Sequence, residues 1–172
     1  ILAVYGWHRY YLVYTYMKHK DEQPRPKSFF DDLPIVTIQL PLYNEMYVVD
    51  RLVDAVCQID YPRERLEIQV LDDSTDETRQ IAELAVRRHA LQGIDIKYIH
   101  RDDRTGFKAG ALDEGLRVAR GTFVAIFDAD FIPKPDFLTR TIHYFTDPKV
   151  ALVQARWGHV NEDYSLLTKI QA

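Results

Sequence analysis

The sequence predicts an α/β domain in which helices cover both faces of a mainly parallel sheet. Short apolar runs alternate with segments that have apolar residues at helical spacing, and this alternation is typical of βαβ units. The 172 residues are enough for one such domain with its own core. A composition of 47% hydrophobic and 28% charged residues argues against disorder, and the net charge of −4 gives no reason to expect nucleic acid as a partner.

The expected elements follow one another from Pro34 onwards. A helix capped by Asn44 is expected to follow the first strand and to carry apolar residues as far as Ile59. The nearly all-apolar run 122–127 suits a strand that is covered on both faces. The expected strands are 35–40, 66–71, 96–99, 122–127 and 150–154, and the other expected helices are 75–91, 108–119 and 136–145.

The first 20 residues, ILAVYGWHRYYLVYTYMKHK, are aromatic and end in basic residues. Because aromatic residues collect at membrane interfaces and basic residues on the cytoplasmic side, we expect residues 1–20 to be the end of a transmembrane helix or an interfacial helix. His8 and Arg9 interrupt the segment, which is too short to span a bilayer unaided. The alternative is an aromatic helix that packs on the domain.

Residues 21–33 are polar, contain two prolines and are expected to form a linker, and residues 34–172 are expected to form the folded domain. The chain does not begin with Met, so we expect it to be part of a longer protein whose domain continues beyond Ala172. The single cysteine, Cys57, excludes an internal disulfide bond. Its place in an apolar helical pattern predicts a buried thiol, which fits a reducing compartment.

Polar residues follow the first four expected strands. Tyr43-Asn44-Glu45 follows the first strand, Asp72-Asp73 the second, Arg101 the third and Asp128-Ala129-Asp130 the fourth. In open α/β sheets, ligands bind outside the carboxyl ends of the strands. We therefore expect these residues to converge on one ligand site.

Asp128 and Asp130 flank a single small residue after an apolar strand. Two carboxylates in this arrangement can share Mg²⁺, which fills its remaining positions with water and phosphate oxygens. Such a cation would neutralise a departing diphosphate. The alternative is a solvated turn, because acidic residues are common in turns.

Two further motifs have both a structural and a functional interpretation. Asp72-Asp73-Ser74-Thr75 suits a helix cap, or one of its carboxylates could accept a hydrogen bond from a nucleotide base. The segment 106–112, GFKAGAL, suits tight helix–sheet packing, or its Lys108 could meet a phosphate or a carboxylate. No dinucleotide fingerprint, P-loop, HExxH or GxSxG motif is present, so those chemistries are unsupported.

Four motifs in this order resemble glycosyltransferase family 2, and within it the processive membrane branch of cellulose synthase-like and mannan or glucomannan synthase-like enzymes. The motifs are Pro41-Leu42-Tyr43-Asn44-Glu45, Leu71-Asp72-Asp73-Ser74-Thr75-Asp76, Lys108-Ala109-Gly110-Ala111-Leu112 and Asp128-Ala129-Asp130. The resemblance implies a GT-A (Rossmann-like) fold in the cytoplasmic domain of a multi-pass membrane protein. It also implies an inverting transferase that uses UDP-glucose or GDP-mannose to extend a β-linked polysaccharide.

The resemblance also implies roles for the motif residues. The nucleotide sugar would be bound by Pro41, Tyr43, Glu45, Asp72, Asp73, Arg101, Lys108, Asp128, Ala129 and Asp130, with Mg²⁺ or Mn²⁺ held by Asp128 and Asp130. The family's general base and its Gln-x-x-Arg-Trp acceptor motif are expected beyond Ala172, so the 172 residues alone would bind donor without transferring sugar. Gln154-Ala155-Arg156-Trp157 has one residue too few between Gln and Arg to be that motif.

The sequence leaves two alternative functions open. A non-catalytic module would bind the nucleotide sugar without transferring it. Phe127-Asp128-Ala129-Asp130 also resembles the nucleophile motif of haloacid dehalogenase-like phosphatases. That motif follows the first strand and continues to Thr or Val, whereas here it follows the fourth expected strand and Ile132 stands in that place.

Overall fold

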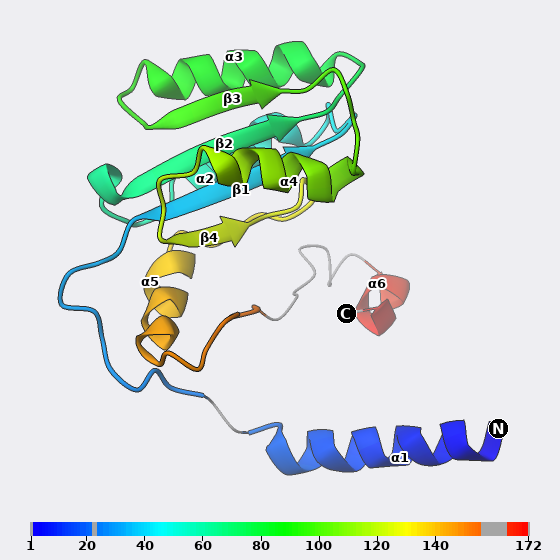
Figure 1. The fold of residues 1–172 in the computed structure, drawn as a ribbon. Coiled ribbons are helices and arrows are strands. Elements are labelled where there is room, and N and C mark those ends of the chain that lie inside the picture. Colours follow the sequence, from blue (N-terminus) through cyan, green and yellow to red (C-terminus); the bar gives the residue numbers. More distant parts are fainter. Residues whose placement is uncertain (1, 22–23, 156–164, 172) are drawn as a thin grey trace.

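The computed structural model describes residues 2–21, 24–155 and 165–171 (Figure 1). Four strands form one parallel sheet in the order β3-β2-β1-β4. The strands are β1 (Val36–Leu42), β2 (Leu66–Asp72), β3 (Ile96–His100) and β4 (Phe123–Ile126). The predicted fold class is therefore confirmed, and the first four predicted strands agree with the observed ones to within one or two residues.

One face of the sheet carries the hydrophobic core. Side chains of this face, such as Ile38 and Ile68, are fully buried against α2 (Val49–Cys57) and α3 (Thr78–Ala90), which pack on each other. Figure 1 shows α4 (Phe107–Arg117) on the opposite face, over β1 and β2. Helices thus cover both faces, as the sequence predicted.

The face beneath α4 is polar. Thr37, Gln39, Glu67 and Gln69 alternate with the core residues of β1 and β2, and each is 0–1% exposed. The Gln39 amide donates to Oε1 of Gln69 at 3.0 Å, and the Thr37 hydroxyl donates to the Glu67 carboxylate at 2.7 Å. These hydrogen bonds offset part of the cost of taking the groups out of water, although Nε2 of Gln69 has no hydrogen-bond partner among the described residues.

A short helical segment supports β4 from the core side. It consists of α5 (Phe137–Thr141) and the 3₁₀ turn η2 (Ile142–Thr146), and a second 3₁₀ turn, η1 (Arg63–Arg65), precedes β2. The ring of Phe137 packs edge-on against Phe127 at 4.9 Å between centroids, and Phe145 packs on Phe123 at 4.7 Å. The helix predicted for 136–145 is therefore present, although its second half has 3₁₀ geometry.

Four local predictions were wrong. Residues 150–155 form no strand, because they pair with no described strand. β4 is an edge strand, and Val124 and Ile126 on one of its faces are 36% and 48% exposed, so the described part of the chain does not cover both of its faces. Asn44 does not cap a helix, because α2 begins only at Val49. In addition, Cys57 is half-buried rather than buried, and burial raises the pKa of its thiol to about 12.

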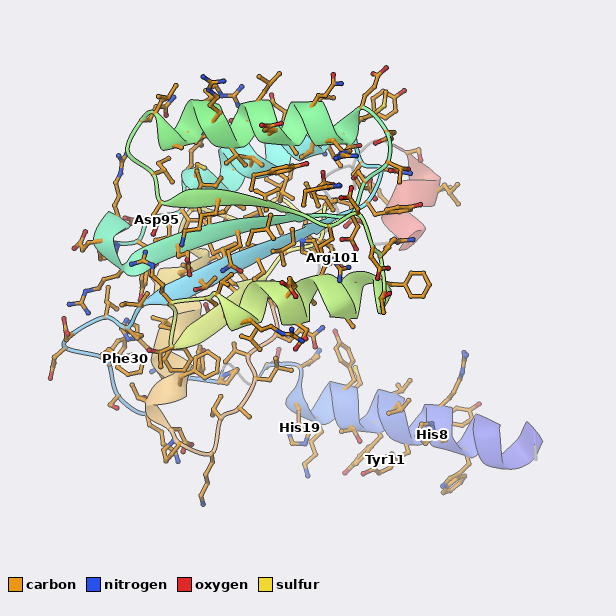
Figure 2. The ribbon with its side chains drawn as sticks, turned by 45° about the horizontal axis from the view of Figure 1, so that its top comes forward. His8, Tyr11, His19, Phe30, Asp95 and Arg101 are labelled. Atoms are coloured by element: carbon orange, nitrogen blue, oxygen red, sulfur yellow. The ribbon has the colours of Figure 1, made fainter. Side chains whose placement is uncertain are left out.

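The N-terminal helix α1 (Leu2–His19) lies apart from the sheet (Figure 1). Its described aromatic side chains are exposed, with Trp7 at 78% and Tyr10 at 77%, and the sticks in Figure 2 project around it. Among the described residues, no helix combines the length and the apolar character that crossing a membrane requires. A last short helix, α6 (Leu166–Gln171), ends the described chain.

Candidate functional site

The carboxyl ends of the three longer strands lie side by side. The register pairs Leu42 of β1 with Asp72 of β2, and Asp72 with His100 of β3. β4 joins the same edge, since the Phe127 amide donates to the Gln39 carbonyl at 3.2 Å. The residues that follow each strand therefore meet at one edge of the sheet, as the sequence predicted, and Figure 2 places Arg101 at this edge and Asp95 at the opposite one.

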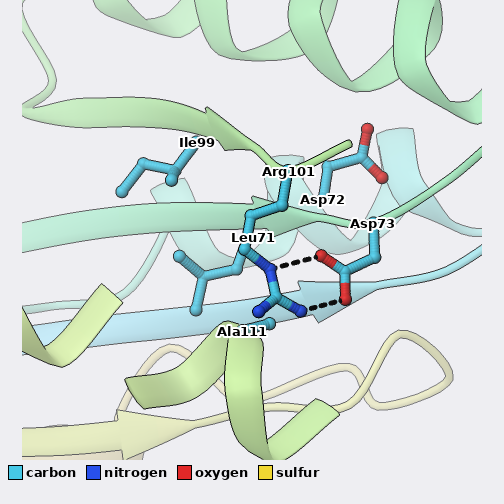
Figure 3. Close-up of a pocket in the computed structure, with 6 residues that line it drawn as sticks. All are labelled: Leu71, Asp72, Asp73, Ile99, Arg101 and Ala111. Carbon is cyan, nitrogen blue, oxygen red and sulfur yellow. Dashed lines mark hydrogen bonds and ion pairs between the residues drawn. The ribbon is translucent and has the colours of Figure 1, made fainter. Parts of the chain in front are cut away.

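Asp73 and Arg101 form a bidentate ion pair across this edge (Figure 3). Nε of Arg101 donates to one Asp73 oxygen at 2.8 Å and Nη2 to the other at 2.5 Å. Their side chains are only 4% and 16% exposed, and the hydrogen bonds from Arg101 to Asp73 raise the pKa of the guanidinium. The pair lines a small pocket together with Leu71, Asp72, Ile99 and Ala111, the last of these from α4.

Asp72 has a different environment from Asp73. Side chains alternate across a strand, so Asp72 lies on the α3 side of the sheet and Asp73 on the α4 side. Asp72 is completely buried; it accepts hydrogen bonds from the Ser74 amide at 2.9 Å and from the Tyr98 hydroxyl at 2.6 Å. Burial and this bond to Asp72 raise the pKa of Tyr98. Asp72 therefore orders the loop, whereas Asp73 holds the basic side chain of the pocket.

The loops after β1 and β2 are joined by Asn44. The backbone amide of Asn44 donates to the Ser74 hydroxyl at 2.9 Å, and the side-chain oxygen of Asn44 accepts from the backbone amide of Thr75 at 3.0 Å. Asn44 adopts a left-handed conformation with φ of 56°, which Asn tolerates better than most residues. Pro41 is half-buried near the end of β1, and the side chains of the neighbouring Tyr43 and Glu45 are exposed.

Lys108 and Asp128 form an ion pair between the start of α4 and the end of β4. Their side chains are 52% and 45% exposed, so both can reach a ligand. Ala129 is 9% exposed and packs in the core, and Asp130 beyond it is exposed. Lys108 therefore contacts a carboxylate, as one interpretation of the sequence expected, while about half of its side chain remains in contact with solvent.

The carboxylates of this edge could hold a metal only together with other ligands. Among the described residues, no group of three or more His, Cys, Asp or Glu side chains lies close enough to hold an ion alone. Two carboxylates separated by one residue, like those of Asp128 and Asp130, suit a cation such as Mg²⁺. This cation takes one or two carboxylates plus phosphate oxygens and water. Asp128, which is half-exposed and paired with Lys108, and the exposed Asp130 are the residues of this edge that offer such carboxylates.

One residue of the edge was missed from the sequence. The guanidinium of Arg104 lies over the Tyr43 ring, 3.3 Å from its centroid, and 5.1 Å from the centroid of the Phe107 ring. The available signal was that Arg104 is a basic residue between two other basic residues, Arg101 and Lys108. Its contact with Tyr43 joins residues that are 61 positions apart in the sequence, and no sequence pattern predicts such a contact.

A parallel α/β sheet with acidic and basic side chains along its carboxyl edge is the architecture of nucleotide-binding domains. The model of the family "Glycosyl transferase family 2" matches residues 37–171. This chain belongs to that family. The phosphatase alternative is thereby excluded, because the acidic triplet belongs to a glycosyltransferase domain.

The chain is similar to plant glucomannan 4-beta-mannosyltransferases. It is 48% identical to glucomannan 4-beta-mannosyltransferase 2 of Arabidopsis thaliana in an alignment of 158 residues, which covers 89% of this chain and 29% of the relative. It is 43% identical to glucomannan 4-beta-mannosyltransferase 1 of Cyamopsis tetragonoloba, over 94% of this chain and 31% of the relative. The chain thus spans about a third or less of the length of these relatives.

Solved structures share the fold. The mannosyltransferase PcManGT from Pyrobaculum calidifontis, in complex with GDP-Man and Mn2+, superposes with a TM-score of 0.73 at 30% identity, over 87% of this chain and 44% of that one. Residues 1–349 of the S. aureus protein TarS superpose with a TM-score of 0.53 at 25% identity, over 61% of this chain and 30% of that one. The GT-A fold expected from the motifs is therefore confirmed.

Proposed function

We propose that this chain is the donor-binding part of an inverting mannosyltransferase that takes GDP-mannose and extends a β-linked polysaccharide. The observation that carries the proposal is the convergence of Asp73, Arg101, Lys108 and Asp128 on one edge of the sheet. The names of the plant relatives and the GDP-Man bound to PcManGT support mannose over glucose, between which the sequence motifs do not distinguish.

In this proposal the nucleoside lies against the loops after β1 and β2. It would contact the Asp73–Arg101 pair and the exposed side chains of Tyr43 and Glu45 in the loop after β1. Lys108 and the carboxylates of Asp128 and Asp130 face the diphosphate. A Mg²⁺ or Mn²⁺ ion bound there would stabilise the negative charge that develops on the departing diphosphate.

The reaction would proceed by direct displacement. The oxygen of an acceptor hydroxyl forms a bond to the anomeric carbon on the face opposite the diphosphate, and the bond from that carbon to the diphosphate oxygen breaks. The hydroxyl proton passes to a general base, which we place in the part of the protein that follows this chain.

The exposed aromatic residues of α1 and the basic Lys18, His19 and Lys20 suit attachment to a membrane surface, with the domain on its cytoplasmic side.

Calorimetric titration of the full-length protein with GDP-mannose and with UDP-glucose, with and without Mn²⁺, tests this proposal. We expect GDP-mannose to bind more tightly, and to lose at least about tenfold in affinity without metal, equivalent to about 1.4 kcal/mol. Asp130→Ala should remove this dependence on metal. The matched control is Asp113→Ala, which changes an exposed aspartate near the far end of α4.

Unchanged donor affinity in Asp130→Ala would refute the metal assignment, and tighter binding of UDP-glucose would refute the assignment of mannose. Transfer to an oligosaccharide acceptor separates an enzyme from a non-catalytic binding module. Binding of donor by the full-length protein without any transfer would favour the module.

A further inference from the structure

Three basic side chains extend from the segment between β3 and the first turn of α4, and two of them are paired. Arg101 is held by both oxygens of Asp73, and Lys108 by Asp128. The third, Arg104, makes no side-chain hydrogen bond or ion pair with any residue that the structure describes, and its Nε atom is buried without a hydrogen-bond partner. A guanidinium keeps its charge at all physiological pH values, so this cation is half-buried without a counter-ion.

The surroundings of Arg104 fix the plane of its guanidinium. The ring of Tyr43 covers its face at 3.3 Å, and Phe107 lies at 5.1 Å. Stacking uses the face of the guanidinium and leaves the N–H groups at its edge able to bind an anion. The group is thus held by aromatic rings rather than by a carboxylate.

The loop that carries Arg104 is preformed. Arg101 donates to the carbonyls of Thr105 at 3.3 Å and of Phe107 at 3.1 Å, and the Asp103 carboxylate accepts from the Thr105 amide at 3.0 Å. Phe107 adopts a left-handed conformation with φ of 52°, which is costly for a residue with a bulky side chain. With this conformation the Phe107 ring lies beside Arg104, and the next residue, Lys108, pairs with Asp128.

Tyr43 and Phe107 bring Arg104 between the two halves of the edge. Tyr43 adjoins Asn44, which orders the loops on the nucleoside side, and Phe107 adjoins Lys108 on the diphosphate side. A nucleoside diphosphate lying along this edge would pass the guanidinium where its phosphates begin. The planar fork of Arg matches the geometry of phosphate oxygens.

We propose that Arg104 binds the diphosphate of the nucleotide-sugar donor, an inference that rests on the proposed function. Its edge N–H groups would bond the phosphate oxygens while Tyr43 and Phe107 hold its plane. Arg104 would then carry part of the affinity for the diphosphate and none of the affinity for the nucleoside.

The test compares guanosine with GDP as ligands of the full-length protein in the presence of Mn²⁺. Arg104→Gln should weaken GDP binding by about 10- to 100-fold, the range for a lost hydrogen bond to a charged group, and should change guanosine affinity less than about twofold. Arg104→Lys, which keeps the charge without the fork, should recover part of the loss. The control is Arg117→Gln at the far end of α4, with both affinities unchanged.

An equal loss of guanosine and GDP affinity in Arg104→Gln would overturn the inference and make Arg104 a purely structural contact of Tyr43. Unchanged GDP affinity would overturn it as well. If the unsubstituted protein binds neither GDP nor UDP, the proposed function fails and the inference fails with it. If the unsubstituted protein binds GDP and only the Arg104 effect is absent, the proposed function stands alone.

Discussion

Replacing Arg101 by methionine tests whether the edge of the sheet depends on a desolvated ion pair. The side chain of Asp73 is 4% exposed and accepts two bonds from Arg101, at 2.8 and 2.5 Å. Methionine has a similar length and removes both bonds without changing the carboxylate. Breaking a buried pair by removing one partner costs about 3–5 kcal/mol, because the remaining charge is left uncompensated.

We expect Arg101→Met to lower the free energy of unfolding at the lower end of that range, about 3 kcal/mol, because Arg101 is still 16% exposed and water can reach the vacated space. Adding Asp73→Asn to Arg101→Met should recover about 1–2 kcal/mol by removing the unpaired charge. Arg117→Met is the control. It breaks an exposed pair with Asp113 on α4, and such pairs contribute less than about 1 kcal/mol.

Urea denaturation followed by circular dichroism measures these differences, with an unchanged dependence on urea as the sign that the unfolded states are alike. An Arg101→Met protein within about 1 kcal/mol of the original would show that the pair is solvated and contributes as little as a surface pair. A double variant no more stable than Arg101→Met would show that the loss comes from the two carbonyl contacts of Arg101 rather than from the charge on Asp73.

Two further predictions concern Lys108 and Glu67. Lys108→Gln should tighten binding of Mn²⁺ alone by up to about fivefold, because it frees Asp128 from a half-exposed ion pair. The same variant should weaken GDP binding by about tenfold, because it removes a cation from the diphosphate. Calorimetry measures both affinities, and a loss of both would contradict the assignment of Lys108 to the diphosphate. Burial opposes ionisation of Glu67, but hydrogen bonds from the Arg120 amide, Lys97 and Thr37 outweigh burial and lower the pKa of Glu67 in the folded state. The ionised carboxylate therefore stabilises the fold at pH values above the unfolded-state pKa of about 4.3. This contribution is lost as the pH falls through the lower folded-state pKa. Glu67→Gln should therefore cost about 1–3 kcal/mol at pH 7 and less at pH 3, whereas equal costs in urea denaturation at the two pH values would contradict this reasoning.

The strands, and the polar residues that follow each of them, could be predicted because both depend on local sequence. The run 66–71 alternates apolar residues with Glu67 and Gln69 and is followed by two acidic residues, and a parallel sheet brings the residues that follow its strands to one edge. The placement of Asp72 and Asp73 on opposite faces of the sheet also follows from the alternation of side chains along a strand, once the last residue of β2 is known. That boundary is the kind of detail that sequence patterns leave uncertain by a residue or two.

The loops could not be predicted, because their conformations depend on contacts between distant segments. Asn44 suits a helix cap by residue type, yet its bonds go to Ser74 and Thr75, 30 residues away. The apolar run 150–154 suits a strand, but a strand needs a neighbour to satisfy its amides and carbonyls. Arg104 was missed for the same reason, since its aromatic partner Tyr43 follows another strand.

The packing and functional interpretations of the segment 106–112 describe one arrangement. A Cβ atom on Gly110 would lie 2.1 Å from the Thr105 carbonyl oxygen, so only glycine lets the first turn of α4 lie against its own entry loop. A Cβ atom on Gly115 would lie 2.7 Å from Nε2 of Gln39, so the helix also lies close to the polar face of the sheet. This close approach brings the start of α4 to the carboxyl edge, where Lys108 reaches Asp128. The glycines would therefore affect donor binding indirectly, because they allow the tight packing of α4 that positions Lys108 at the site.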